Sequence, residues 1–271
     1  VQLAVVAVEI ALAQLWTSWG LQPAMVLGHS LGEYSALCVA GVLTVTDTFY
    51  LVGQRATMMT ESLTANEYAM LAIGADIDAV SNRLSAGSYS SCMVACLNAP
   101  KATVVSGPVC ELETLQEKIR DDGIRSALLR VPFGFHSKQL DPILDQYESS
   151  AGGVFFSAPR VPIASTLFGD IVQDELVISP AYLRRQAREP VNFMGALWAA
   201  QRAGLVRDDT LFVEMGPDPV CLGLLRASLG SAAAARLLPT LRKGEDNWAT
   251  ASSSLAAIYR AGLSVNWVQY H

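Results

Sequence analysis

Residues 26–33 of the sequence are Val26-Leu27-Gly28-His29-Ser30-Leu31-Gly32-Glu33, a serine between two glycines. The apolar run 24–27 predicts a short buried strand, and residues 33–40 predict the start of a helix. A serine on such a strand-to-helix turn needs small neighbours, because its backbone is strained and other segments approach closely. The turn exposes the Ser30 hydroxyl and directs the Leu31 amide towards an oxyanion. We interpret the segment as a nucleophile elbow; the alternative is the same pattern in an ordinary loop.

The composition indicates a compact globular protein. With 51% hydrophobic and 16% charged residues, the 271-residue chain can bury a large core. Its net charge of −6 argues against nucleic acid as the main partner. Five cysteines without a C-x-x-C pair predict reduced thiols, a cytoplasmic location and no zinc site. The apolar stretch Val1 to Trp16 is too short for a membrane span and predicts a buried helix packed under the elbow.

A central segment of the chain has its own order of predicted strands and helices. Residues 67–131 predict the β-α-β-β-α-β order of a ferredoxin-like small subdomain. Its strands are expected at 69–73, 91–97, 103–106 and 126–131, and its helices at 76–86 and 108–122. Residues 1–66 and 132–271 are expected to form an α/β-hydrolase-like catalytic subdomain. Its helices are predicted at 1–18, 46–62, 139–150, 180–187, 193–203 and 248–261, and its later strands at 159–167, 210–215 and 236–241. Because a fold of this kind normally opens with a strand, we expect one ahead of Val1.

The chain holds three histidines that could serve Ser30 as a base. His29 adjoins the serine, and its side chain is expected to point away from the hydroxyl. His271 ends a tail that is expected to be irregular. Elimination leaves His136, between a strand and a helix, as the candidate base; the alternative is a structural histidine. No carboxylate between Ser30 and His136 is placed to orient the ring, so a backbone carbonyl is expected instead, and the turn 216–219 is one candidate.

Arg55 lies among apolar neighbours on the helix predicted beside the elbow. A buried guanidinium needs an anionic partner. One interpretation is an ion pair with Glu33 or Glu61. The other is bidentate binding of a substrate carboxylate. The sequence leaves both interpretations open.

Several short motifs follow one another in order along the chain. They are Gly28-His29-Ser30-Leu31-Gly32-Glu33-Tyr34, Gln54-Arg55, Asn98-Ala99-Pro100 with Val105-Ser106-Gly107, Phe135-His136-Ser137 and Glu214-Met215-Gly216-Pro217. Together they resemble malonyl-CoA:acyl carrier protein transacylase (acyltransferase) domains over nearly the whole chain. The residue sequence of the elbow, together with Pro190-Val191-Asn192-Phe193, is most similar to the corresponding segments of the iterative non-reducing polyketide synthases of fungi.

The resemblance implies a role for each matching residue. Ser30 would carry the acyl group as an ester, His136 would be general base and acid, and Arg55 would bind the malonyl carboxylate. The Leu31 amide would supply half of the oxyanion hole. The other half comes in related enzymes from a Gly-Gln-Gly segment, which this sequence lacks and which is expected ahead of Val1.

Four further positions follow from the resemblance. Phe135 matches the malonyl-selective form, since methylmalonyl-selective relatives carry serine there. His29 and Asn98 are weaker candidates for substrate binding, and a turn role is the alternative for Asn98. Gly134 stands where alanine is usual, a change expected to be tolerated.

The expected reaction moves malonyl from malonyl-CoA through a Ser30 ester to the phosphopantetheine thiol of an acyl carrier protein, supplying extender units for polyketide synthesis. The implied partners are malonyl-CoA, the carrier protein and a neighbouring ketosynthase domain of the same megasynthase. No bound cofactor, metal, nucleic acid or membrane is expected. The alternatives are a serine esterase or thioesterase-type hydrolase, which needs no buried cation, and a non-catalytic structural domain. Arg184, Arg185 and Arg188 are expected to form a solvated helix face; the alternative is that they meet an acidic carrier protein or the phosphates of CoA.

Overall fold

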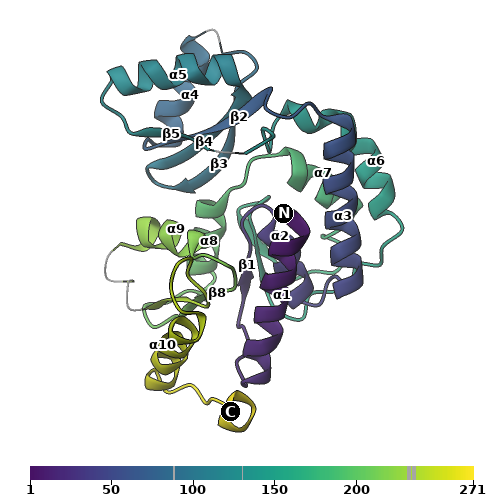
Figure 1. Ribbon diagram of the computed structural model, residues 1–271, viewed down its shortest axis with the longest axis vertical. Coiled ribbons are helices and arrows are strands. Elements are labelled where there is room, and N and C mark those ends of the chain that lie inside the picture. The colour runs from purple at the N-terminus through teal and green to yellow at the C-terminus, as the bar shows by residue number, and fades with distance from the viewer. Residues whose placement is uncertain (88, 130, 231–232, 234–235) are drawn as a thin grey trace.

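The computed structural model describes residues 1–87, 89–129, 131–230, 233 and 236–271. A four-stranded sheet with two helices lies at one end of the molecule, and a larger part rich in helices lies at the other (Figure 1). Arg130, near the end of the strand predicted at 126–131, lies outside the described residues. In the described ranges, no helix is both long and apolar enough to cross a membrane.

The elbow has the predicted form. Strand β1 (Val26–Leu27) ends just before the turn, and helix α2 (Gly32–Val39) begins just after it. Gly28 permits this geometry, because a Cβ atom there would lie 2.4 Å from Glu33 Cα. Gly32 is not crowded, since the nearest atom to its Cβ position is Glu9 Oε1 at 3.9 Å. The close-approach argument therefore holds for Gly28 and is wrong for Gly32.

Four helices surround α2 in the larger part: α1 (Gln2–Ser18), α3 (Val45–Ser62), α6 (Asp141–Ala151) and α7 (Pro180–Arg188). Their shared core includes the fully buried side chains of Val6, Leu37, Leu51, Tyr147 and Leu183. The helix expected at 139–150 starts as a 3₁₀ turn, η1 (Lys138–Leu140), before it continues as α6. The elbow therefore rests on a packed helical base.

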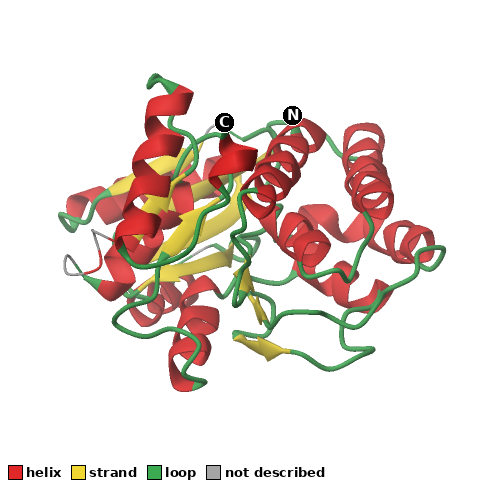
Figure 2. Cartoon of the chain, turned by 90° about the horizontal axis from the view of Figure 1, so that it is seen from below, coloured by secondary structure: helices red, strands yellow, loops and turns green. Residues whose placement is uncertain are grey.

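The strands of the larger part form two small sheets. β1 pairs in parallel with β6 (Ile163–Ser165), and β6 pairs antiparallel with β7 (Asp170–Val172). β8 (Phe212–Glu214) pairs in parallel with β9 (Leu237–Pro239). Helices α8 (Phe193–Arg202), α9 (Val220–Leu229) and α10 (Asn247–Arg260) complete this part, and helices lie on both sides of the strands (Figure 2). The strand expected ahead of Val1 stays a prediction.

The four-stranded sheet, here called the small sheet, has the predicted βαββαβ order. Its elements are β2 (Tyr68–Ile73), α4 (Ile77–Ala86), β3 (Met93–Ala99), β4 (Ala102–Pro108), α5 (Val109–Asp121) and β5 (Ser126–Leu129). The strands run antiparallel in the order β3-β4-β2-β5, which is the ferredoxin-like arrangement. The α/β fold class is confirmed. The exact limits of the two subdomains stay a prediction.

An extended segment after α7 joins the two parts. Val191 N donates to Ala95 O and Leu97 N donates to Val191 O, both at 2.8 Å, so the segment adds to the edge of β3. Because Val191 is buried, this junction belongs to the core.

The C-terminal tail is ordered, contrary to expectation. It forms α11 (Trp267–Tyr270), and Asn266 N donates to Trp19 O at 2.7 Å. The Tyr270 ring packs edge-on against Trp19 with centroids 5.2 Å apart. These aromatic contacts hold a four-residue helix that has no stability of its own.

Candidate active site

Ser30 and His136 meet at the elbow. Ser30 Oγ lies 2.7 Å from His136 Nε2, and the histidine is 2% exposed. The loop that carries His136 is held by Gln139, whose Oε1 accepts from Gly134 N at 2.7 Å and whose Nε2 donates to Thr64 O at 2.9 Å. The sequence placed these two residues together correctly by motif and elimination.

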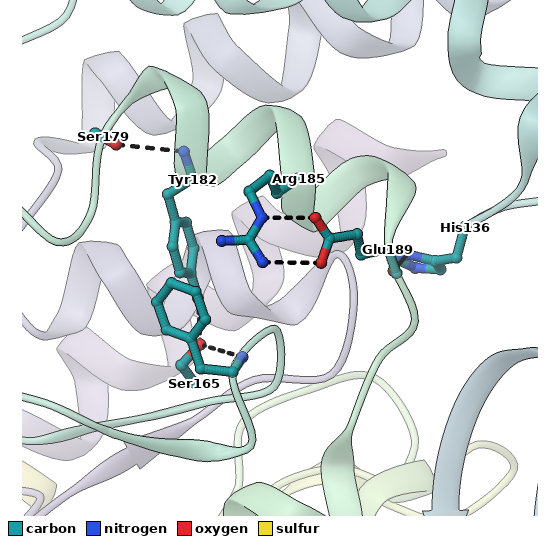
Figure 3. Close-up of polar contacts among 7 residues, drawn as sticks. His136, Ser165, Ser179, Tyr182, Arg185 and Glu189 are labelled. Atoms are coloured by element: carbon teal, nitrogen blue, oxygen red, sulfur yellow. Dashed lines mark hydrogen bonds and ion pairs between the residues drawn. The ribbon is translucent and has the colours of Figure 1, made fainter. Parts of the chain in front are cut away.

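A backbone carbonyl orients the His136 ring, as expected, but it belongs to Glu189 and not to the turn 216–219. His136 Nδ1 lies 2.9 Å from Glu189 O (Figure 3). Because a carbonyl only accepts, Nδ1 carries the proton and Nε2 accepts from Ser30 Oγ in the neutral ring. Glu189 precedes Pro190 and is extended, with ψ of 161°, so its carbonyl is turned out of α7.

The surroundings keep His136 neutral. Burial, together with the nearby Arg55 and His29, lowers its pKa from the usual 6.5 to about 3. The imidazole is therefore unprotonated at neutral pH and able to take the serine proton.

Arg55 is a buried cation beside this pair. It is 3% exposed, its Nη2 donates to Gln2 Oε1 at 2.9 Å, and its guanidinium stacks on Tyr34 with 5.2 Å to the ring centroid. Its Nε atom has no hydrogen-bond partner among the described residues. Neither Glu33 nor Glu61 forms an ion pair with it in the described chain, so the ion-pair interpretation is wrong. A dry guanidinium with an unused donor fits an anionic group from outside the chain.

The side chain of His29 bonds to Asn98, while Ser30 Oγ bonds to His136. His29 Nε2 donates to Asn98 Oδ1 at 2.7 Å, and the His29 ring packs on Phe193 with centroids 5.7 Å apart. Asn98 lies on β3, so this bond ties the elbow to the small sheet. His29 and Asn98 therefore both have a structural role, which is to connect these two segments.

Leu31 and Phe135 border the reacting pair along the chain. The Leu31 N–H has no acceptor among the described residues, so it is free to bind an oxyanion. Phe135 is half-buried and packs against the hydrophobic cores on both sides of the site.

The sequence missed a buried polar cluster under the elbow. Glu33 is 1% exposed, accepts from Thr166 Oγ1 at 2.9 Å and also accepts from Tyr182 Oη. Burial raises the pKa of Glu33 to about 7, although these hydrogen bonds oppose the shift. Gln186 Nε2 donates to Ser30 O at 2.8 Å. No local pattern predicted these contacts, because the partners of Glu33 and Ser30 lie on α7 and next to β6, far along the chain.

The three arginines of α7 are ion-paired with acidic side chains. Arg184 pairs with Asp145 and Glu148. Arg185 binds both oxygens of Glu189, at 2.6 and 3.0 Å, and Arg188 pairs with Asp141 at 2.5 Å. These pairs tie α7 to α6 and to its own C-terminal end. In the described part of the chain, no three His, Cys, Asp or Glu side chains gather to hold a metal ion.

Comparison with known proteins gives a consistent result. The family model of the acyl transferase domain matches residues 1–265. A non-reducing polyketide synthase of Aspergillus ustus is 52% identical over 271 residues, and one of Cladonia grayi is 49% identical over 270. Each match covers 100% of this chain and 13% of the relative, so the chain spans about an eighth of their length.

Solved structures agree with these relatives. The acyltransferase domain from the second module of the salinomycin polyketide synthase is 32% identical, with a TM-score of 0.87 over 98% of this chain and 60% of that chain. The malonyl CoA-acyl carrier protein transacylase of Coxiella burnetii is 25% identical, with a TM-score of 0.83 over 96% of this chain and 78% of that chain.

Proposed function

Since this chain belongs to the acyl transferase domain family, of the type found in polyketide synthases, we propose that its acyl group is malonyl and its acceptor an acyl carrier protein. Malonyl-CoA is the donor, and the phosphopantetheine thiol of the carrier protein is the acceptor. The phosphopantetheine belongs to the partner, and a ketosynthase domain of the same synthase uses the product.

Acylation begins at the Ser30–His136 pair. His136 Nε2 takes the hydroxyl proton as Ser30 Oγ attacks the thioester carbonyl, and the Leu31 N–H binds the resulting oxyanion. The tetrahedral intermediate collapses, the C–S bond breaks, and the CoA thiolate leaves with the proton from His136. The carbonyl of Glu189 holds Nδ1–H throughout, and so stabilises the imidazolium that forms between these steps.

Transfer to the carrier protein reverses the roles. His136 takes the proton of the phosphopantetheine thiol, and the sulfur attacks the carbonyl of malonyl-Ser30. The ester C–O bond then breaks, and Ser30 leaves with the proton that His136 returns. Both half-reactions therefore need one histidine that is neutral at rest, which the low pKa of His136 supports.

The observation that carries the choice of malonyl is Arg55. A guanidinium that is 3% exposed, with an unused Nε donor and no carboxylate from the described residues, suits a substrate carboxylate in a dry site. A simple esterase acting on neutral acyl groups has no use for such a buried cation. Arg55 thus favours a dicarboxylate half-thioester over an uncharged acyl group.

Intact-protein mass after mixing with malonyl-CoA tests the proposal. A malonyl adduct on the parent protein, absent from Ser30→Ala and discharged by a carrier protein bearing phosphopantetheine, is the expected result. Free malonate released without a carrier protein indicates a hydrolase and overturns the proposal. A protein that stays unmodified overturns it as well.

A further inference from the structure

Helix α7 contacts both members of the reacting pair. Near its end, Gln186 Nε2 donates to Ser30 O at 2.8 Å. The residue that follows the helix, Glu189, offers its carbonyl to His136 Nδ1 at 2.9 Å. The position of one helix therefore sets the backbone of the nucleophile and the orientation of the base.

Tyr182 attaches this helix to the elbow helix α2. Its hydroxyl donates to Glu33 Oε1 and accepts from Ser165 Oγ, which lies 2.7 Å away. Tyr182 is 2% exposed, Glu33 1% and Ser165 0%, so the whole chain of hydrogen bonds is shielded from water. Figure 3 shows Tyr182 extending from α7 towards Ser165, while the backbone of Glu189, just after the same helix, lies beside His136.

The ion pairs of α7 are weaker attachments. Arg184, Arg185 and Arg188 form ion pairs whose acidic partners are 36% to 92% exposed, and exposed pairs contribute little. A hydrogen bond to a buried carboxylate is much stronger, because no water can replace the lost donor. The Tyr182–Glu33 bond is thus the main polar link between α7 and α2, the helix that follows the nucleophile, and Gln186 bonds directly to Ser30.

We propose that Tyr182 is a positioning residue for acyl transfer: its hydrogen bond to Glu33 fixes α7 at the distance that keeps Gln186 on Ser30 and the Glu189 carbonyl on His136. The inference rests on the proposed roles of Ser30 and His136. Tyr182 does not contact Arg55, so its loss should slow acylation while substrate binding stays the same.

The test compares Tyr182→Phe with Thr103→Val. Thr103 also has a buried hydroxyl, which donates to Ala75 O at 2.9 Å, but it lies in the small sheet away from α7. The probe is p-nitrophenyl acetate, a neutral activated ester that acylates a reactive serine whichever acyl-CoA is the natural donor. Tyr182→Phe should slow acylation of Ser30 about tenfold with unchanged half-saturation, as expected for a misaligned base, and Thr103→Val by less than about twofold.

Glu33→Gln provides a conservative rescue. The glutamine oxygen can still accept from Tyr182, and its NH₂ group can donate to Thr166 Oγ1, whose hydroxyl already lies 3.3 Å from Gly28 O. This variant should keep at least a third of the parent acylation rate. In proton NMR, a downfield His136 Nδ1–H signal should persist in Glu33→Gln and shift upfield or broaden in Tyr182→Phe.

Three results overturn the inference: parent-like acylation by Tyr182→Phe, equal slowing by Thr103→Val, or more than tenfold slowing by Glu33→Gln. The result for Glu33→Gln overturns the inference even if Tyr182→Phe fails to fold. A parent protein that does not react with the ester at Ser30 also overturns it. A parent that reacts with the ester but forms no malonyl adduct refutes only the proposed function, because the variant comparison uses the ester.

Discussion

Ser30 and His136 face each other at 2.7 Å with their backbones in the same rare conformation, with φ of 52° and 56°. Left-handed φ values are unfavourable for residues other than glycine, and they persist only where surrounding contacts enforce them. Here Gly28 makes room for one turn, and Gln139 holds the other. The contact between Ser30 and His136 is therefore built into the fold.

Ser30→Ala should abolish the acyl adduct, because it removes the hydroxyl that lies 2.7 Å from His136 Nε2. His136→Ala should slow adduct formation about a hundredfold or more, the usual scale for losing a general base. Rapid-quench mass spectrometry with malonyl-CoA measures both. Full labelling of Ser30→Ala would show that the nucleophile lies elsewhere.

The rate of acylation should not fall near pH 6.5, where an ordinary histidine becomes protonated. Because burial lowers the pKa of His136 to about 3, its ring stays neutral well below pH 6.5. The rate of Ser30 acylation by the neutral ester should therefore stay flat from about pH 8 down to about pH 5. A half-maximal rate near pH 6.5 would mean that the ring is solvated as an ordinary histidine.

Arg55→Ala should discriminate between acyl groups. If Arg55 binds the malonyl carboxylate, its loss leaves that anion unpaired in a dry pocket, at a cost of about 3 kcal/mol or about a hundredfold in loading. Acetyl-CoA carries no such charge and should load Arg55→Ala at least as well as the parent. Arg55→Lys should recover only part of the malonyl rate, because an ammonium cannot bind a carboxylate through two parallel donors. Equal losses of malonyl and acetyl kcat/KM would make Arg55 a purely structural residue.

Phe135→Ser should relax selection against a branched extender unit. We propose that the half-buried Phe135 ring, next to the base, leaves no room for a methyl group on the malonyl Cα. The smaller serine should raise methylmalonyl transfer relative to malonyl transfer, measured as a ratio of kcat/KM values in competition. The same ratio in parent and variant would place the selection at another residue.

Glu33→Gln should change the pH dependence of stability. The folded protein raises the Glu33 pKa from 4.5 to about 7, so it binds a proton that the unfolded chain has already released between these values. This contribution to stability is complete below about pH 4.5 and is lost as the pH rises through about 7, a change of about 3 kcal/mol. The stability advantage of the parent over Glu33→Gln should shrink accordingly. His136 titrates in the opposite sense in both proteins and cancels in this difference. Denaturation curves from pH 4.5 to 8 that run parallel would contradict the assignment.

Local patterns predicted most of the fold. Helix α3 was predicted from its helical spacing of apolar residues, and the βαββαβ order from strand and helix patterns with the turn at 98–100. They failed for β7 and α11, which have three and four residues and depend on distant partners. Trp19, for example, holds α11 from the opposite end of the sequence.

The candidate site was predictable where its chemistry lies in side-chain motifs. The Ser30–His136 pair was identified in this way. The role of Glu189 was not predicted, because it contacts His136 through its backbone carbonyl, a group that every residue has. Only Pro190 indicated that the helix ends near this residue. The partnership of Glu33 with Tyr182 spans 149 positions and had no sequence signal.

Gly134 illustrates the limit of inference from family motifs. The resemblance implied alanine there, yet a Cβ atom in this chain would lie 2.6 Å from Ser106 Oγ and 2.8 Å from Tyr68 Cβ. The histidine loop therefore lies closer to the small sheet than an alanine at position 134 would permit.

Val191, which pairs with β3, lies two residues beyond the carbonyl that holds His136. The strand that borders the small sheet and the support of the imidazole are thus one piece of backbone, two peptide units long. We therefore expect a shift of the small sheet to move the Glu189 carbonyl and, with it, the ring of His136. The rate of Ser30 acylation should consequently depend on how β3 packs against the segment at Val191. Substitutions in β3 should then change this rate even where they do not contact the substrate.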